Sequence, residues 1–197
     1  KAGGPVDSFP VDGTAYSYST NFGSGSEIGT GNFVVWSGAG QPNRISALTR
    51  DVVYHFRLFE FNGSGATANY NTNAAAGNPI SQTTKGADPG TPVASDLAAS
   101  PIGTTTATLS WTPGDGTYAL VVMKADTSGV ADPTDLATYT ANPAFGSGDE
   151  TGSGSYVVYK GAGTSVPVTN LDPGRRYYFA VYMFNGSSPG AENYRTS

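Results

Sequence analysis

The clearest pattern of hydrophobic and polar positions lies between Arg175 and Phe184. Tyr177, Phe179, Val181 and Met183 alternate with the residues between them and so share one face of an extended chain. Pro173-Gly174 precedes this run and Asn185-Gly186 follows it, and both pairs are typical of tight turns. The pattern predicts one long strand over residues 175–184.

Shorter runs of the same kind occur along the whole chain, and no stretch shows sustained helical periodicity. In one such run Ala107, Leu109 and Trp111 share a face, and in the next we expect Tyr118, Leu120 and Val122 to point inward. A short helical turn is expected near residues 133–137, inside a long loop from 126 to 154. The predicted strands cover residues 15–20, 32–38, 44–48, 52–61, 78–85, 105–111, 117–125, 155–160, 166–171 and 175–184. Short strands separated by turns predict an all-β fold built from sandwiches.

The chain contains an internal repeat with an offset of 123 residues. Residues 22–65 and 145–188 share 19 identities in 44 positions, and Leu48 and Tyr54 stand where Leu171 and Tyr177 stand. After that, one residue is inserted in the second copy, so that Asn69 matches Asn193. The period exceeds that of solenoid repeats, so each copy is expected to be a domain with its own core.

The repeat predicts a domain over residues 1–86, a Pro/Gly-rich linker over 87–92 and a second domain over 93–197. The first copy has no equivalent of residues 97–123, and the second has none of residues 78–85. We therefore expect one sandwich without its N-terminal strands and one without its last strand. Either the chain is a segment of a longer polypeptide, or neighbouring copies supply the missing strands.

Composition narrows the classes of function. Only 13% of residues are charged, the net charge is −5 and no basic patch is visible, so nucleic acid is an unexpected partner. Cysteine is absent, so the fold uses no disulfides, and no apolar run approaches the roughly 18 residues of a membrane span.

The chain resembles the fibronectin type III domain in several places. Trp111 on a predicted strand, a Pro-rich lead-in over 86–96 and the spacing of Leu, Pro-Gly, Tyr and Asn across residues 171–185 carry the resemblance. It implies two tandem, immunoglobulin-like β-sandwiches, each with a tyrosine corner, formed by Leu48 with Tyr54 and by Leu171 with Tyr177. The first copy departs from the family pattern at residues 49–51, which replace the Pro-Gly turn, and at Glu60. The variant sequence at 144–163 and 185–197 is similar to repeats in large secreted and surface proteins of Bacteroidota, which implies an extracellular or cell-surface location.

Candidate sites are few, and no catalytic, cofactor-binding or metal-binding residues are assigned. The single histidine, His55, is expected on the face opposite Tyr54, and a lone histidine is a poor zinc site. Acidic residues in the loops could bind calcium, but solvated turns are the favoured interpretation. These acidic residues are Asp7, Asp12, Glu27, Asp126, Asp132, Asp135, Asp149 and Glu150.

An aromatic row is the best candidate for a partner surface. Tyr178, Tyr182 and Phe184 are expected on the outer face of the last predicted strand, and Phe59 and Phe61 stand at equivalent places in the first copy. An exposed row of this kind can stack sugars or contact proteins. The alternative is packing across strands against neighbours such as Tyr156 and Tyr159.

Two functions fit the sequence. The first is a non-catalytic spacer in a long extracellular or cell-surface bacterial protein, such as an adhesin or filament, whose partners are other repeats of the same polypeptide or neighbouring copies. The second is a glycan- or protein-binding module of a secreted hydrolase, in which the aromatic row holds the ligand.

Overall fold

The computed structural model describes residues 1–40 and 44–196, and the chain divides into two compact units, Lys1–Thr84 and Lys85–Ser197. Among the described residues no helix is long and apolar enough to cross a membrane. Residues 87–92, expected as a linker, fall within the second unit, where the Pro92 carbonyl accepts a hydrogen bond of 2.8 Å from the Asp115 N–H. The neighbouring Gly86 N–H likewise donates to the Ala191 carbonyl at 2.7 Å.

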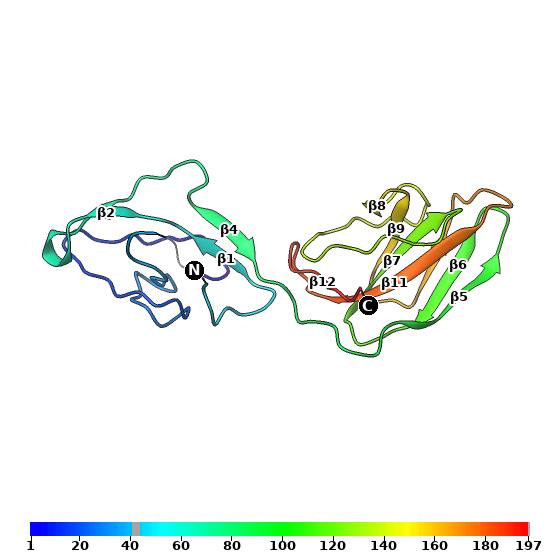
Figure 1. Cartoon of the computed structure of the whole chain (residues 1–197), viewed down its shortest axis with the longest axis horizontal. Coiled ribbons are helices and arrows are strands. Elements are labelled where there is room, and N and C mark those ends of the chain that lie inside the picture. Colours follow the sequence, from blue (N-terminus) through cyan, green and yellow to red (C-terminus); the bar gives the residue numbers. More distant parts are fainter. Residues whose placement is uncertain (41–43, 197) are drawn as a thin grey trace. The chain divides into compact units, whose positions relative to one another are not determined.

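Two antiparallel sheets form the second unit (Figure 1). One has the order β10-β6-β5 and the other the order β12-β11-β7-β9-β8. Their bounds are β5 Ser95–Ile102, β6 Ala107–Thr112, β7 Tyr118–Ala125, β8 Glu150–Gly152, β9 Ser155–Gly161, β10 Ser165–Val168, β11 Tyr177–Asn185 and β12 Asn193–Tyr194. The chain is thus all-β, as the sequence predicts. The expected helical turn near 133–137 is a hydrogen-bonded turn without a helix, closed from Ala137 N–H to the Thr134 carbonyl at 3.2 Å.

The core between these sheets combines β6 with alternate residues of β7. Leu109 and Trp111 point into this core, as predicted, and meet Val121 and Met123. The predicted face of β11 also contributes, with Met183 buried and Tyr177, Phe179 and Val181 packed at its edge. One prediction is wrong: Leu120 and Val122 do not face this core.

Leu120 and Val122 lie instead in a second core on the outer face of the five-stranded sheet. They are fully buried with Val157, Tyr182, Phe184 and Tyr194. The long segment between β7 and β8 covers this face and packs Val130, Tyr139 and Ala141 against it. Because both faces of β7 are covered, its sequence is a continuous apolar run rather than a half-buried alternation.

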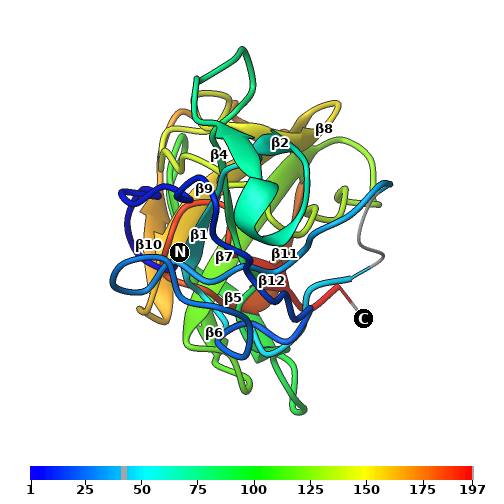
Figure 2. The ribbon, with the colours of Figure 1, turned by 90° about the vertical axis from the view of Figure 1, so that its left-hand side faces the viewer.

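The first unit has fewer strands than the sequence predicts, and most of it runs as irregular chain (Figures 1 and 2). β1 pairs with β4 and β2 pairs with β3, all antiparallel, and a single 3₁₀ turn η1 precedes β3. The bounds are β1 Val53–Phe56, β2 Glu60–Asn62, η1 Gly65–Thr67, β3 Asn69–Asn71 and β4 Ile80–Thr83. The predicted strand 52–61 is therefore divided, and 15–20, 32–38 and 44–48 form only isolated bridges or none.

The absence of a β7 counterpart among residues 1–84 explains the error at residues 32–38. In the second unit, β7 lies between β11 and β9 and pairs with both. Residues 1–84 include no counterpart of most of β7, so residues 32–38, the equivalent of β9, lack the neighbour that would complete a ladder. Between β1 and β2 the Asn78 side chain takes the place of a strand, because its amide group bonds both the N–H and the carbonyl of Leu58 at 2.9 Å.

Many tertiary contacts recur in both units at the offset of the sequence repeat. Phe22 packs edge-on against Tyr54 with ring centroids 5.0 Å apart, and Phe145 packs against Tyr177 at the same 5.0 Å. The Tyr70 hydroxyl donates to the Thr14 carbonyl and the Tyr194 hydroxyl to the Ala137 carbonyl, each at 2.9 Å. The two units therefore share the aromatic and turn contacts that hold their loops in place.

Candidate functional site

Each unit has one tyrosine whose hydroxyl caps the turn before its own strand. The Tyr54 hydroxyl accepts a hydrogen bond of 2.9 Å from the Thr49 N–H, and the Tyr177 hydroxyl accepts one of 2.9 Å from the Asp172 N–H. Leu171 packs at the edge of the inter-sheet core beside Tyr177. This is the geometry of a tyrosine corner, which fixes the path of the chain as it enters the strand.

A second pair of tyrosines does the same in the loop that follows β7 and in its equivalent. The Tyr16 hydroxyl accepts from the Val11 N–H at 3.1 Å, and the Tyr139 hydroxyl accepts from the Thr134 N–H at 3.0 Å. The sequence analysis did not assign this pair a role. The sequence could have indicated it, because each tyrosine stands five residues after the residue whose N–H donates to it, and the two tyrosines are 123 residues apart.

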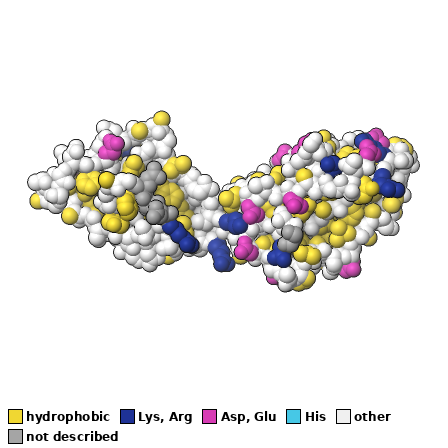
Figure 3. All heavy atoms as spheres, in the orientation of Figure 1, with side chains coloured by type: hydrophobic (Ala, Val, Ile, Leu, Met, Phe, Trp, Pro, Cys, Tyr) yellow, Lys and Arg dark blue, Asp and Glu magenta, His cyan; other side chains and the backbone are white. Residues whose placement is uncertain are grey.

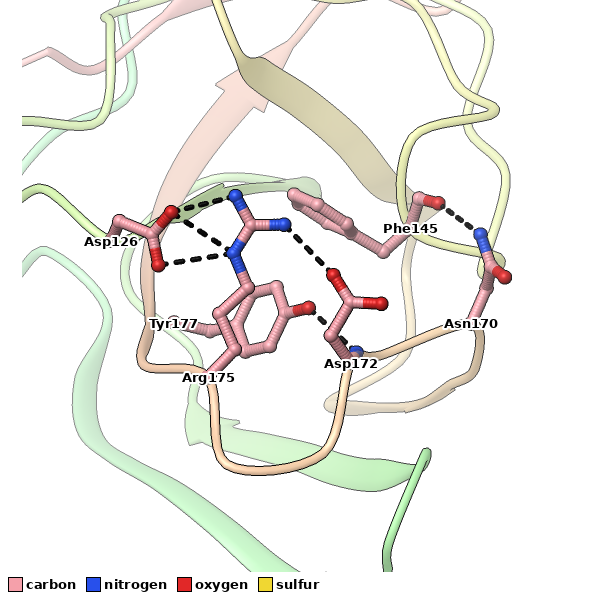
Figure 4. Close-up of polar contacts among 6 residues, drawn as sticks. All are labelled: Asp126, Phe145, Asn170, Asp172, Arg175 and Tyr177. Carbon is pink, nitrogen blue, oxygen red and sulfur yellow. Dashed lines mark hydrogen bonds and ion pairs between the residues drawn. The ribbon is translucent and has the colours of Figure 1, made fainter.

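Arg175 ties the turn before β11 to the end of β7 (Figure 4). Its Nε and Nη2 atoms contact both carboxylate oxygens of Asp126, with a shortest distance of 2.6 Å, and Nη1 bonds Asp172 at 2.9 Å. The hydrogen bonds from Arg175 lower the pKa of Asp126. These groups are substantially exposed, so the network positions the turn more than it adds stability.

The aromatic row is not the exposed surface that the sequence predicts. Tyr182 is 7% exposed and Phe184 is 2% exposed, both inside the second core, so the expected exposure of these two is wrong. The Tyr182 hydroxyl lies 2.9 Å from the Asp132 carboxylate, and burial, followed by that hydrogen bond, raises the pKa of Tyr182. Tyr178 remains half-buried on β11 and hydrogen-bonds with Arg176.

In the first unit the equivalent aromatic residues stay accessible. Phe61 is 41% exposed and lies against Tyr70. Phe59 is half-buried, with Phe9 edge-on at 5.8 Å and the Arg57 guanidinium 5.2 Å from its ring centre. His55 lies on β1 and is half-buried.

Most of the loop carboxylates considered as calcium ligands make separate contacts in the structure, either hydrogen bonds to backbone N–H groups or ion pairs with basic side chains. The Asp12 carboxylate accepts from the Tyr70 N–H at 2.7 Å, Asp135 accepts from the Tyr194 N–H at 2.8 Å and Asp149 accepts from the Thr140 N–H at 2.6 Å. No group of three or more metal-ligating side chains occurs among residues 1–40 and 44–196. Asp12, Asp135 and Asp149 therefore cap backbone N–H groups.

One ion pair is sheltered. Lys160 on β9 contacts Glu192 at 2.8 Å, with the Glu192 side chain 3% exposed. Burial by itself raises the pKa of Glu192, but hydrogen bonds from Lys160, the backbone and Thr138 outweigh it and lower the pKa. The aligned positions in the first copy are Ser37 and Ala68, so the pair belongs to the second unit alone.

The comparisons with known proteins agree with this geometry. The model of the fibronectin type III domain matches residues 91–196, more than half of the chain. The chain belongs to the fibronectin type III family. Domains of this family are generally non-catalytic modules, typical of extracellular proteins and spacers.

Other comparisons add little to the family assignment. The rat CD45 extracellular region, domains d3-d4, is similar in structure over 86% of this fibronectin type III chain and 76% of its own, with 14% identity and a TM-score of 0.31. No curated protein matches the sequence.

We expect Tyr177→Phe to lower the free energy of unfolding of the second unit by about 1 kcal/mol, because the Asp172 N–H loses its acceptor while the ring stays packed. Urea denaturation followed by fluorescence measures the change. Tyr178→Phe is the matched control, since its hydroxyl caps no turn. Equal stabilities of the two variants would show that the corner bond contributes nothing.

The Lys160–Glu192 pair predicts a pH dependence. The folded-state pKa of Glu192 is lowered, so its contribution is present above its ordinary pKa of about 4.3 and is lost as the pH falls through the lowered value. Glu192→Gln should therefore cost about 2 kcal/mol at pH 7 and much less near pH 3. Denaturation curves at both pH values test this, with the exposed Glu150→Gln as control. A cost that is the same at both pH values would contradict the assignment.

Proposed function

We propose that the chain is a non-catalytic structural spacer, made of two fibronectin type III units, within a longer extracellular or cell-surface bacterial protein. The observation that carries this is the recurrence of the same holding contacts in both units. Tyrosine caps, aromatic pairs and carboxylate caps all act on turns and loops. In the described residues, these side chains hold the turns and loops in place.

Treating the first unit as a second member of the family is part of this proposal. It rests on the sequence repeat, on the Tyr54 corner and on the Tyr16 cap, each of which has its counterpart 123 residues later. Two such domains in tandem, without disulfides, would serve as a spacer between other parts of the polypeptide.

In the second unit, the glycan-binding alternative loses its main support. Tyr182 and Phe184 are core residues, so they offer no face for stacking a sugar. Tyr178 is the one member of the second-unit row that a ligand could still reach, at its half-buried position.

Stretching single molecules of the full chain between two handles tests the spacer proposal. The second unit, residues 85–197, should unfold in one step and release about 38 nm of extended chain, roughly 3.4 Å for each residue, less the length of the folded unit. A glycan array probed with the same protein should show no saturable binding. Saturable binding that Tyr178→Ala abolishes would overturn the proposal in favour of a binding module.

A further inference from the structure

An apolar groove of about 330 Å³ opens along β1 and β2 in the first unit. Two of its walls come from segments that are far apart in the sequence, 33–38 and 55–59 with Phe61, and residues between 1 and 32, Ile45 and Tyr70 complete the lining. Hydrophobic side chains gather on the visible face of this unit in Figure 3. Phe33, Val34, Trp36, Phe59 and Phe61 are among the residues that line the groove.

The second unit shows what belongs in this place. There, the same two walls are β9 and β11, and β7 lies between them and pairs with both. Val157 and Phe184, beside β7, are 0% and 2% exposed, whereas the equivalent Val34 is half-buried and Phe61 is 41% exposed. The groove therefore lies at the position that β7 occupies in the second unit.

Lys1 and Ala2 lie where Lys124 and Ala125, the last two residues of β7, lie in the second unit. The Lys1 carbonyl accepts a hydrogen bond from the His55 N–H at 2.8 Å, and the Lys1 amino group donates to the His55 carbonyl at 2.9 Å. Ala2 bridges Tyr54 in the register in which Ala125 pairs with Tyr177. The N-terminus lies beside β1 (Figure 1).

The backbone beyond this pair is oriented to receive more of a strand. In an antiparallel ladder, hydrogen-bonded pairs recur at every second residue. After the His55–Lys1 pair, the next N–H and carbonyl groups facing the same edge are those of Arg57 and Phe59. Leu58, between them, turns its backbone to the opposite edge, where Asn78 binds it.

We propose that this groove binds an extended polypeptide strand of the β7 type, placed antiparallel to β1 and in line with Lys1. The strand needs a continuous apolar run like residues 119–123, because in the second unit both faces of β7 are buried. Backbone bonds to the free edge would give affinity, and the apolar side chains would fill the groove and set specificity. The inference rests on the proposed equivalence of the two units, and it identifies their mode of assembly.

Fusion of a second copy of residues 115–123 in front of Lys1 of the full chain tests the proposal. The added sequence runs into Lys1 as the original runs into Lys124. Trp36 lines the groove, while Trp111 is 5% exposed in the second unit, so quenching of tryptophan emission by acrylamide reports mainly on Trp36. We expect the quenching constant to fall severalfold and binding of the dye ANS to fall with it.

The matched control carries aspartate in place of the copied Val121 and Val122 in the added segment only. Its tryptophan emission should be quenched by acrylamide, and it should bind ANS, to the same extent as in the unmodified chain. Equal quenching of the fused chain and this control would overturn the proposal. So would a dimer of the unmodified chain, seen by light scattering, in which Trp36 is already shielded, since a second intact copy would then fill the groove. Neither result depends on the unfolding step of the second unit, which tests the spacer function separately.

Discussion

Tyr182→Ala should lower the free energy of unfolding of the second unit by about 3–5 kcal/mol, the range for removing a large buried aromatic side chain. The ring is 7% exposed and packs in the second core on the outer face of the sheet. The change also leaves Asp132 without the Tyr182 hydroxyl, 2.9 Å away. Thermal and urea denaturation measure the loss.

Tyr178→Ala is the control for this change, because Tyr178 lies on the same face of β11 but is half-buried and outside the second core. Its cost should stay near 1 kcal/mol, in the range of ordinary substitutions. If the two variants lose the same small amount of stability, the outer face of the sheet is open, and the covered second core does not exist.

Gly186→Ala should cost about 3 kcal/mol, because two separate obstacles meet at this turn. Gly186 has a φ of 104°, which L residues rarely adopt, and strain of this kind costs about 1–3 kcal/mol. An added Cβ would also lie 2.3 Å from the Ala191 carbonyl oxygen. That oxygen accepts a hydrogen bond from the Gly86 N–H, so it is held against moving away.

Gly174→Ala separates the two obstacles. Gly174 has a φ of 74°, and an added Cβ would meet nothing within 4 Å. Only the conformational cost remains, about 1 kcal/mol. A Gly174→Ala variant as unstable as Gly186→Ala would mean that steric contact at Ala191 has no effect on stability.

The sequence predicts the second unit well where local pattern and tertiary contacts agree. The alternation at Ala107, Leu109 and Trp111 identifies β6 and its buried face. Through its resemblance to the fibronectin type III pattern, the Leu171–Tyr177 spacing implies the corner, and the Tyr177 hydroxyl accepts the hydrogen bond of such a corner from the Asp172 N–H. In such places one amphipathic strand lies against one core, and period-2 alternation is enough.

The errors come from partners that are distant in the sequence. Alternation cannot show that the loop between β7 and β8 covers the outer face of the sheet, and so Tyr182 and Phe184 were expected to be exposed. In the first unit, residues 32–38 have strand-like composition but lack the neighbour that would make them a strand. A strand depends on hydrogen bonds to another segment, and local sequence does not reveal whether that segment is present.

We propose that the two units are copies of one domain type, and that residues 1–84 include no counterpart of β5, of β6 or of most of β7. Amide hydrogen exchange of the unmodified chain, resolved by residue with NMR, tests it most directly at equivalent positions. We predict that the N–H groups of Ala180 and Tyr182, which face β7, exchange only on unfolding of the second unit, while those of Arg57 and Phe59 exchange at least about 100-fold faster. Equal protection at the two pairs of positions would contradict the account.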